Sequence, residues 1–538
     1  METRLIAVLV VAVLISAFAR RYNLSSPLVL VVAGLSASLI PGLPEIDLNP
    51  EFVLFIVLPP LLWSAGLESS YVALRKNIRP VAMLAVGLPL ATALAVVLVA
   101  YKTVPGLSIA SALTLGAIVA PPDAVSATAI GRRLGLSRRT MTLLGGESLL
   151  NDATALTAYK VSLAAAIGVA ASWGAAAGTF ALALVGGVLT GAASGVLLTH
   201  LRSRLDDPLV ESAIGLTAPF IIYLVADEIR GSGVLAVVVA ALILGQRSTR
   251  AGYATRLQDD AVWKALQLIL EAFAFFMIGL QLPGVLDDIR GMPATVMLGY
   301  SAAVLAAVIA VRIVWIYTFT YVPRLVSARA RNRADAASVA EVFVVAWAGM
   351  RGVVSLAAAF ALPATTLSGA PFPGRPHIVY LTFVVVVGTL LLHGLTLPWI
   401  IKALGVRGHD ERAEAVAAAA AQERAARAAA DRLDDVLAAV QARGQRTEAH
   451  DRAAEALKNW NARRRHSAWE GLRPDHAETG ESQTGESLNA VFRRLRLEMI
   501  EAERDAFIDE RDSGRIDDEV LRAALRGLDF EEAIVKRE

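Results

Sequence analysis

The chain has 538 residues, of which 55% are hydrophobic, and its mean hydropathy is +0.54. Soluble domains average roughly 45–50% apolar residues, so this composition excludes an ordinary soluble protein. The net charge of +2 gives no indication of a nucleic-acid partner, and the absence of cysteine excludes disulfides and thiolate metal ligands.

Apolar stretches separated by short polar connections recur through the first 404 residues. A membrane-spanning helix needs roughly 20 predominantly apolar residues, so we predict an all-α polytopic membrane protein. The thirteen predicted transmembrane helices are residues 4–19, 25–40, 51–69, 80–100, 107–130, 140–168, 174–200, 208–229, 232–245, 259–283, 292–321, 337–362 and 376–403.

The basic residues of the connections predict the orientation. Connections after odd-numbered spans are rich in arginine, whereas those after even-numbered spans carry only Lys102, Arg230, Arg290 and Arg375. We expect the protein to lie in the plasma membrane. The positive-inside rule then places its N-terminus outside the cell and its C-terminal tail in the cytoplasm. A cleaved signal peptide ending at 17–19 is the alternative for the first span, although the arginines that follow it favour retention.

The fifth span contains the run Ala120-Pro121-Pro122-Asp123. Two consecutive prolines remove two amide donors and clash with the preceding turn, so we expect an interrupted helix beside a buried carboxylate. Interrupted helices in transporters expose carbonyls and helix ends that coordinate ions. The alternative is a simple proline kink in which Asp123 caps the second half-helix.

The sixth span contains GGESLLNDATAL at residues 145–156. Glu147 and Asn151 are four residues apart, as are Ser148 and Asp152, so their side chains share one side of a helix. Ionisable groups inside a bilayer are costly and mark functional sites. This oxygen-rich side predicts a site for a small hard cation or a proton.

The later spans contain further charges. Glu271 in the tenth span and Arg312 in the eleventh are expected to pair with each other as a structural salt bridge rather than to act in transport. Asp227 and Glu228 end the eighth span and predict a solvated mouth. His393 in the last span is expected to be a packing residue rather than a pH sensor.

The twelfth span places Arg351 between Gly349 and Gly352. An arginine in an apolar helix needs a partner, and we expect Glu147 to supply it; snorkelling of Arg351 to an interface is the alternative. If spans 1–6 and 8–13 are inverted repeats, the fifth and twelfth spans correspond. Interrupted segments at corresponding places indicate a transporter binding site.

Residues 405–538 differ from residues 1–404 and are rich in Ala, Arg, Glu and Asp. We expect a helical, charged cytosolic tail with a flexible linker near 471–487 and amphipathic helices after it. Its role, whether regulation, partner binding or shielding of the cytoplasmic face, is left open.

Four segments together resemble the monovalent cation:proton antiporter-1 family, the bacterial sodium/proton antiporters related to the sodium/hydrogen exchangers. They are GESLLND at 146–152, PPDAVSA at 121–127, GMRGVVSLA at 349–357 and LEAFAFFMIGL at 270–280. The resemblance covers residues 1–404. It implies a homodimer with a dimerisation domain and a mobile core domain that holds the ion site.

The resemblance also implies residue roles. Asp152 is the carboxylate that alternately carries cation and proton, and Asn151 is typical of electroneutral members. Ser148 and Asp123 are the other ion-site positions, with Asp152 and Asp123 as the acidic ligands of Na⁺. Glu147 is implied to form a stabilising ion pair with Arg351.

Pro122 departs from the family pattern, because many members carry threonine immediately before the aspartate of the fifth span. A hydroxyl ligand is therefore absent, although the carbonyl of Pro122 or Pro121 remains as a ligand. This departure bears on ion selectivity.

We therefore predict a secondary active antiporter, not an enzyme, that exchanges Na⁺, with Li⁺ and K⁺ as further substrates, for H⁺ by alternating access. The expected stoichiometry is one to one and electroneutral, serving pH and sodium homeostasis, with no cofactor. Three alternatives stay open at this point: a cation channel, a membrane receptor or scaffold with a signalling tail, and an organic-anion transporter in which Arg351 binds a carboxylate.

Overall fold

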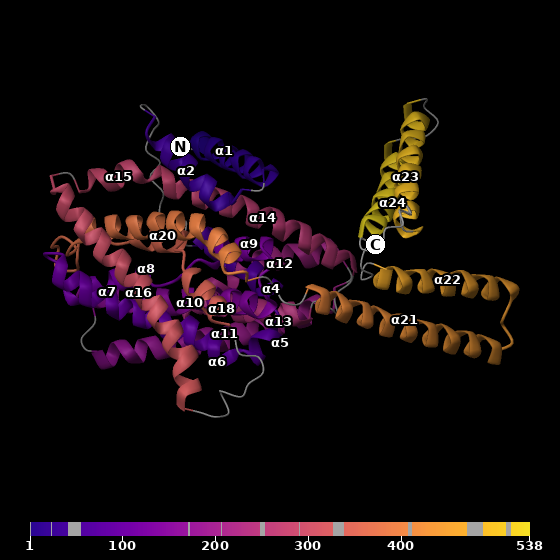
Figure 1. Ribbon diagram of the computed structural model, residues 1–538, viewed down its shortest axis with the longest axis horizontal. Helices are drawn as coiled ribbons and strands as arrows, with labels where there is room; N and C mark the ends of the chain where they lie inside the picture. The colour runs from indigo at the N-terminus through magenta and orange to yellow at the C-terminus, as the bar shows by residue number, and fades with distance from the viewer. Residues whose placement is uncertain are drawn as a thin grey trace. The chain divides into compact units, whose positions relative to one another are not determined.

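A computed structural model describes residues 2–22, 24–40, 55–169, 173–205, 207–247, 253–289, 291–326, 338–406, 411–470, 488–512 and 518–537. The chain divides into two compact units, residues 1–408 and 409–538. Helices make up the regular secondary structure of the described residues in both units (Figure 1).

The first unit contains α1 (Glu2–Arg21), α2 (Ser26–Ser38), α4 (Leu58–Glu68), α5 (Tyr71–Lys76), α6 (Ile78–Ala82), the π-helix η1 (Met83–Gly87), α7 (Leu88–Thr103), α8 (Ile109–Val119), α9 (Ala124–Arg133), α10 (Arg138–Ala166), α11 (Trp173–Arg202), α12 (Pro208–Glu228), α13 (Gly233–Arg247), α14 (Tyr253–Leu280), α15 (Leu282–Asp287), α16 (Ala294–Val326), α18 (Val339–Trp347), α19 (Val353–Phe360) and α20 (Arg375–Ala403).

Each of the predicted spans coincides with one helix or with consecutive helices of this unit, although the starts of the third and the twelfth lie outside the described residues. Within the described residues, six helical stretches are long and apolar enough to cross a membrane, and α2, α8 and α13 are shorter apolar helices. The prediction of a multi-pass helical membrane protein is confirmed, whereas the count of thirteen crossings stays a prediction.

Both predicted interruptions are present. α8 ends at Val119 and α9 begins at Ala124, so the break contains Pro121 and Pro122, which cannot donate backbone hydrogen bonds. The second break separates α18 from α19 and spans 348–352. The chain therefore contains two pairs of half-helices in place of two continuous spans.

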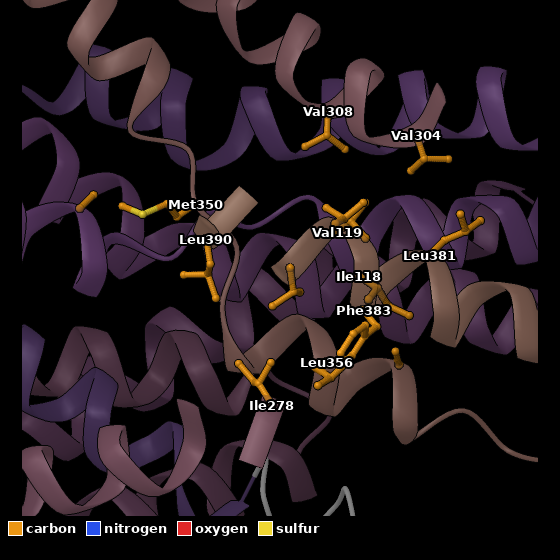
Figure 2. Close-up of a cluster of buried hydrophobic side chains, with 14 of the residues drawn as sticks. Ile118, Val119, Ile278, Val304, Val308, Met350, Leu356, Leu381, Phe383 and Leu390 are labelled. Carbon is orange, nitrogen blue, oxygen red and sulfur yellow. The ribbon is translucent and has the colours of Figure 1, made fainter. Parts of the chain in front are cut away.

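A large apolar cluster surrounds the two breaks (Figure 2). Ile118 of α8, Leu356 of α19 and Leu390 of α20 belong to it, and Met350 contributes from the second break. Inside a membrane, lipid replaces water around the helices, so close packing and dispersion between such side chains stabilise the unit. The cluster holds the half-helices against one another.

A second apolar cluster joins α4, α12 and α13, with Trp63 and Val237 fully buried in it. Leu149 and Ala153 of α10 contact this second cluster, while Leu144 of the same helix belongs to the first. α10 thus lies between the two cores, and its polar residues are positioned by both.

The second unit consists of α21 (Glu411–Ala442), α22 (Glu448–Glu470), α23 (Leu488–Asp512) and α24 (Asp518–Arg537). α21 contacts α22, and α23 contacts α24 through a small apolar cluster around Ile500 and Leu528. The helical character expected of the tail is present in its described residues, and the predicted linker at 471–487 lies outside them.

Candidate cation site at two interrupted helices

The two helix breaks touch through their backbones. The amide of Asp123 in the first break donates a hydrogen bond of 2.7 Å to the carbonyl of Met350 in the second. A Cβ atom on Gly352 would lie 2.7 Å from the Cβ and 2.9 Å from the Cγ of Asp123, closer than real Cβ contacts come. Only glycine at 352 therefore permits this approach of the second break to the Asp123 side chain.

α10 contacts the first of these two breaks through Asn151, which is fully buried. Its Nδ2 donates a hydrogen bond of 2.8 Å to the carbonyl of Pro122. Because that carbonyl can only accept, the bond assigns the amide orientation and leaves Oδ1 facing elsewhere. Within the residues that the structure describes, Asn151 Oδ1 is buried without a hydrogen-bond partner. An orphaned buried oxygen of this kind suits a hard cation or a water molecule.

Asp152 is the next residue on α10 and is partly buried. It lies within electrostatic range of Asp123 in the first break. Ser148 is partly buried one turn earlier on the same side of α10. The oxygen-rich patch that the spacing predicts stays a prediction, to which the structure adds the buried Oδ1 of Asn151 on the same helix. Among the described residues no group of three or more His, Cys, Asp or Glu is placed to hold a metal ion.

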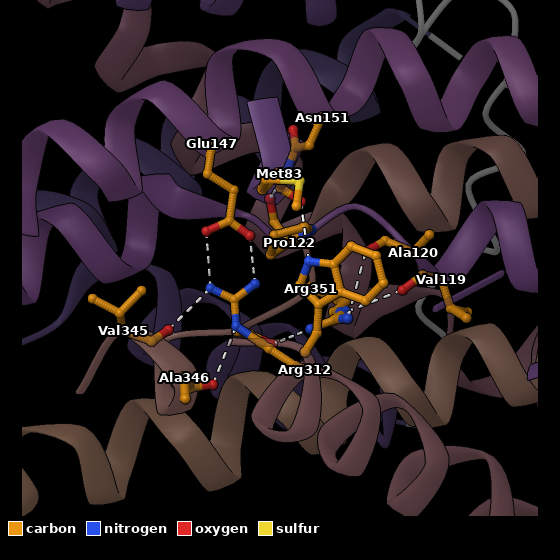
Figure 3. A network of polar contacts seen from close by, with 12 residues as sticks. Met83, Val119, Ala120, Pro122, Glu147, Asn151, Arg312, Val345, Ala346 and Arg351 are labelled. Carbon is orange, nitrogen blue, oxygen red and sulfur yellow. Dashed lines mark hydrogen bonds and ion pairs between the residues drawn. The ribbon is translucent and has the colours of Figure 1, made fainter. Parts of the chain in front are cut away.

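Glu147 forms a buried ion pair with Arg312 of α16 (Figure 3). Arg312 Nη1 lies 2.5 Å from Glu147 Oε1, and Nη2 lies 2.9 Å from Oε2, so the pair is bidentate. Both side chains are 2% exposed. The guanidinium also donates to the carbonyls of Val345 and Ala346, at the carboxyl end of α18. Arg312 therefore fastens α10 and α18 to α16.

Arg351 does not bind Glu147, so the predicted Glu147–Arg351 pair is wrong. The buried Arg351 side chain donates to the carbonyl of Val119 at 3.0 Å and to that of Ala120 at 3.5 Å (Figure 3). It also donates to the carbonyl of Gly349 at 2.5 Å. These first two carbonyls close α8, where the helix dipole is negative and backbone acceptors lack helical partners. The helix end takes the place of a carboxylate partner.

Glu271 does not pair with Arg312, so that prediction is also wrong. The Glu271 carboxylate accepts a hydrogen bond of 2.6 Å from Gln267, one turn earlier on α14. Gln267 in turn accepts a bond of 3.3 Å from Ser64 of α4. No sequence signal connects Arg312 with Glu147 rather than with Glu271, because the choice depends on which helices are neighbours.

The remaining polar residues are as follows. His393 is buried, and its ring meets that of Trp347 edge to face at 4.9 Å. Asp227 forms an ion pair of 2.5 Å with Lys160, and both side chains are about half exposed, 48% and 59% respectively.

At each break, charged side chains lie at helix ends whose partial charge is of the opposite sign. Arginines meet the carboxyl ends of α8 and α18, and Asp123 stands immediately before the amino end of α9, beside the residue that precedes α19. Helix carboxyl ends favour cations and amino ends favour anions. The sequence predicts both interruptions, whereas the contact between them and the placement of the arginines are seen only in the fold.

Comparisons with known proteins agree with this architecture. The family described as sodium/hydrogen exchanger, transmembrane, matches residues 6–403. An uncharacterised Na⁺/H⁺ exchanger of Mycobacterium tuberculosis is 35% identical over 98% of this chain and 95% of its own length. The Na⁺/H⁺ antiporter ApNhaP of Aphanothece halophytica is 33% identical over 71% of this chain and 70% of its own.

Among solved structures, the sodium proton antiporter MjNhaP1 of Methanocaldococcus jannaschii at pH 8 has the same fold, with a TM-score of 0.55 over 74% of this chain and 98% of that one. Its sequence identity is 18%, so the likeness concerns the fold alone. The family match over most of the chain identifies the family. This chain belongs to the sodium/hydrogen exchanger family.

Proposed function

We propose that this chain is a secondary active antiporter that exchanges a monovalent cation, Na⁺ before Li⁺ and K⁺, for H⁺ by alternating access and with one-to-one, electroneutral stoichiometry. Family membership supports cation/proton antiport. The observation that carries the residue-level proposal is the buried, unpartnered Oδ1 of Asn151 beside Asp152, at the contact of two broken helices.

Asp152 is the proposed carrier. A carboxylate in a partly dry site binds either a proton or a cation, and the two compete because both neutralise the same charge. Movement of an empty, charged site through an apolar barrier is costly. Occupancy by either ion therefore permits the change of access, and vacancy prevents it, which suppresses leak.

The cation ligands in this proposal are oxygens. Asp152 and Asp123 supply charge, Asn151 Oδ1 supplies a neutral oxygen, and Ser148 supplies a hydroxyl. The carbonyl of Pro122 accepts the Asn151 amide with one lone pair and has a second available. Hard monovalent cations take oxygen ligands of these types, as other hard cations do.

The charges around the contact between the two helix breaks support the exchange of one proton for each cation. Glu147 and Arg312 neutralise each other in a bidentate pair. Arg351 and Asp123 carry opposite charges on breaks that are hydrogen-bonded to each other. Asn151 is uncharged, and we assign to Asp152 the charge that changes in each cycle.

The named relatives bear on cation choice. A Bacillus pumilus protein named sodium, potassium, lithium and rubidium/H⁺ antiporter is 30% identical over 69% of this chain and 57% of its own length. The Aphanothece halophytica relative is named for Na⁺. Na⁺ is therefore proposed first, with Li⁺ and K⁺ as further substrates.

The proposed setting is the plasma membrane, with the N-terminus outside and the tail in the cytoplasm, as the loop charges predict. A homodimer is proposed from the family resemblance. The proposed transport domain comprises residues 1–404, and regulation is the role proposed for the tail after it.

An organic-anion transporter is disfavoured by the surroundings of Arg351. Its guanidinium is engaged by three backbone carbonyls, and the side chain is 1% exposed. A carboxylate substrate would need to displace these bonds. A channel and a receptor with a signalling tail lack a specific observation in their favour.

Flux measurements on reconstituted wild-type protein test the proposal. Proteoliposomes with an acidic interior receive Na⁺, Li⁺, K⁺ or choline outside, and internal pH is followed with a dye. We expect the interior to become alkaline with the alkali cations but not with choline. In the sodium series, with equal K⁺ concentrations inside and outside, we expect the same rate with and without valinomycin. A rate that rises when valinomycin clamps the voltage would contradict electroneutral exchange, and no cation-dependent flux would contradict antiport.

A further inference from the structure

A polar cavity of about 930 Å³ lies among the ends of α4, α11, α12, α13 and α14. It is on the arginine-rich side of the unit, which the loop charges predict to be cytoplasmic. Ligand cavities in proteins commonly have volumes of about 300–1,000 Å³. Among the described residues that line it, none belongs to α10 or to either helix break. The cavity is therefore separate from the proposed cation site.

The carboxylates that line the cavity are engaged by cations within the described residues. The pairs, with their N–O distances, are Asp259 with Arg202 at 2.6 Å, Glu211 with Arg202 at 3.7 Å, Asp260 with Lys264 at 2.8 Å and Glu68 with Arg132 at 3.4 Å. Asp259 also accepts a hydrogen bond of 2.7 Å from Ser212. The Arg202 side chain is only 10% exposed, so its two pairs are largely shielded from solvent. These carboxylates are held by the protein itself.

Arg247 is a cation of the lining without a carboxylate partner. It is the last residue of α13 and is exposed. Within the part of the chain that the structure describes, its side chain forms no hydrogen bond or ion pair. The lining side chains and Arg132 together carry five lysine or arginine cations against four carboxylates. The surplus charge is positive and favours an anionic occupant.

The amino end of α14 adds hydrogen-bond donors to the cavity. α14 begins at Tyr253, and its first turn lines the cavity with Ala254, Thr255 and Arg256. The first amides of a helix lack helical acceptors and lie at the positive end of the helix dipole, so helix amino ends bind anions.

Thr255 is a second, independent indication at the same helix end. Its side chain lines the cavity and is 1% exposed. Among the described residues, its Oγ1 has no hydrogen-bond partner. A buried hydroxyl without a partner is unfavourable, and it can donate to an anion. A hydroxyl, helix amides and Arg247 together form a donor set suited to phosphate oxygens.

An apolar wall accompanies these donors. Val196 of α11 lines the cavity and is 49% exposed, and Leu244 of α13 lines it as well. α11 is a candidate membrane span with most of its residues unburied, as expected of a helix that faces lipid. The cavity is therefore lined in part by the side of α11 that acyl chains contact in a membrane. Basic pockets between transmembrane helices on the cytoplasmic side bind phospholipid head groups.

We infer that this cavity binds a phosphate group, held by Arg247, Thr255 and the amino end of α14, and that an anionic phospholipid of the cytoplasmic leaflet supplies it. Free phosphate offers the same oxygens but has no acyl chains to contact Val196 and Leu244. The inference goes beyond the proposed exchange of cations and does not depend on it. The bound lipid would join the ends of α11, α13 and α14.

Lipid binding by the full-length protein tests the inference. Delipidated protein in detergent is titrated with dioleoylphosphatidylglycerol, dioleoylphosphatidylcholine or inorganic phosphate, and native mass spectrometry counts the bound molecules. We expect phosphatidylglycerol to bind at least about tenfold more tightly than phosphatidylcholine, whose choline compensates the phosphate charge. We expect inorganic phosphate to bind more weakly than phosphatidylglycerol.

Three variants locate the site. Arg247→Gln should raise the Kd for phosphatidylglycerol by at least about fivefold, and Thr255→Val, which keeps the shape without the hydroxyl, by at least about twofold. Neither side chain has a partner within the described residues, so the unfolding temperature should stay near that of the wild type. Arg133→Gln removes an exposed arginine of α9 that does not line the cavity and should leave the Kd unchanged.

The outcomes separate the two sources of phosphate from surface charge. Inorganic phosphate binding that depends on Arg247, with no preference for phosphatidylglycerol, would support a phosphate site and overturn the lipid as its source. Equal Kd values for wild type and Arg247→Gln with both probes would contradict the site. An equal loss in Arg133→Gln and Arg247→Gln would contradict it too, because surface charge alone would explain the binding. None of these measurements requires transport, so failure here leaves the antiport proposal untouched.

Discussion

Arg312 and Glu147 stand 165 residues apart in the chain and form a bidentate, buried ion pair, with N–O distances of 2.5 and 2.9 Å. The pair joins α16 to α10, the helix that carries Asn151 and Asp152, and through the carbonyls of Val345 and Ala346 it also holds the end of α18. The proposed cation site thus lies on the helix that this buried ion pair holds in place.

Breaking this anchor should destabilise the protein strongly. Glu147→Gln or Arg312→Met leaves the other charge buried without a partner, which typically costs about 3–5 kcal/mol. Chemical unfolding in detergent measures the loss. Lys160→Ala, which removes an exposed pair with Asp227, should cost only about 0–1 kcal/mol. Similar losses in the buried and exposed pairs would contradict the anchoring role.

The partner of Glu147 can be identified by double-mutant cycles. Glu147→Gln and Arg312→Met should show a coupling free energy above about 1 kcal/mol, since contacting residues couple by roughly 0.5–3 kcal/mol. Glu147→Gln and Arg351→Met should be close to additive, because Arg351 binds the carbonyls at the end of α8. A stronger coupling of Glu147 to Arg351 than to Arg312 would restore the pairing expected from the sequence.

Gly352→Ala should impair exchange without unfolding the chain. The added methyl would lie 2.7 Å from the Cβ of Asp123, so the second break must move away from the first. We expect a fall in kcat/KM for Na⁺ of about tenfold or more, equivalent to roughly 1.4 kcal/mol of lost transition-state stabilisation. Gly145→Ala is the matched control, because nothing lies within 4 Å of the added carbon. Wild-type exchange by Gly352→Ala would show that the close approach is dispensable.

The tail hairpin of α23 and α24 should lose stability in acid. Hydrogen bonds from Lys536 and Arg504 lower the pKa of Glu532 from its ordinary value of 4.5 to about 2. Because the pKa is lower in the folded state, this contribution is complete above about pH 4.5 and is lost as the pH falls toward 2. Hydrogen exchange of α24 amides, corrected for intrinsic rates, should show protection decreasing from pH 6 to pH 3. Glu532→Gln should reduce this dependence; an unchanged dependence would assign it to other groups.

The sequence predicts the helices and the breaks because their signals are local. Prolines at 121 and 122 disrupt a helix wherever it packs, and apolar length predicts a span without knowledge of its neighbours. The i,i+4 spacing likewise places Glu147 and Asn151 on one side of α10, and the bond from Asn151 to Pro122 shows that Asn151 meets the first break.

The two ion pairs expected within the membrane were wrong because pairing is a long-range property. Glu147, Glu271, Arg312 and Arg351 offer several neutral combinations, and sequence alone does not rank them. In the fold, the end of α8 supplies carbonyls for Arg351, which releases Glu147 to Arg312 and leaves Glu271 with Gln267. Helix ends are acceptors that a count of charged side chains overlooks.

The most direct test of the account is sodium-dependent proton flux by Asp152→Asn in proteoliposomes, beside wild type and Gly145→Ala at equal amounts of folded protein. The substitution keeps the size of the side chain and removes the charge for which proton and cation compete. We expect Na⁺-dependent flux in wild type and Gly145→Ala and none in Asp152→Asn, whose unfolding temperature stays near that of the wild type. Persistent Na⁺-dependent flux in folded Asp152→Asn would contradict the assignment of Asp152 as the carrier.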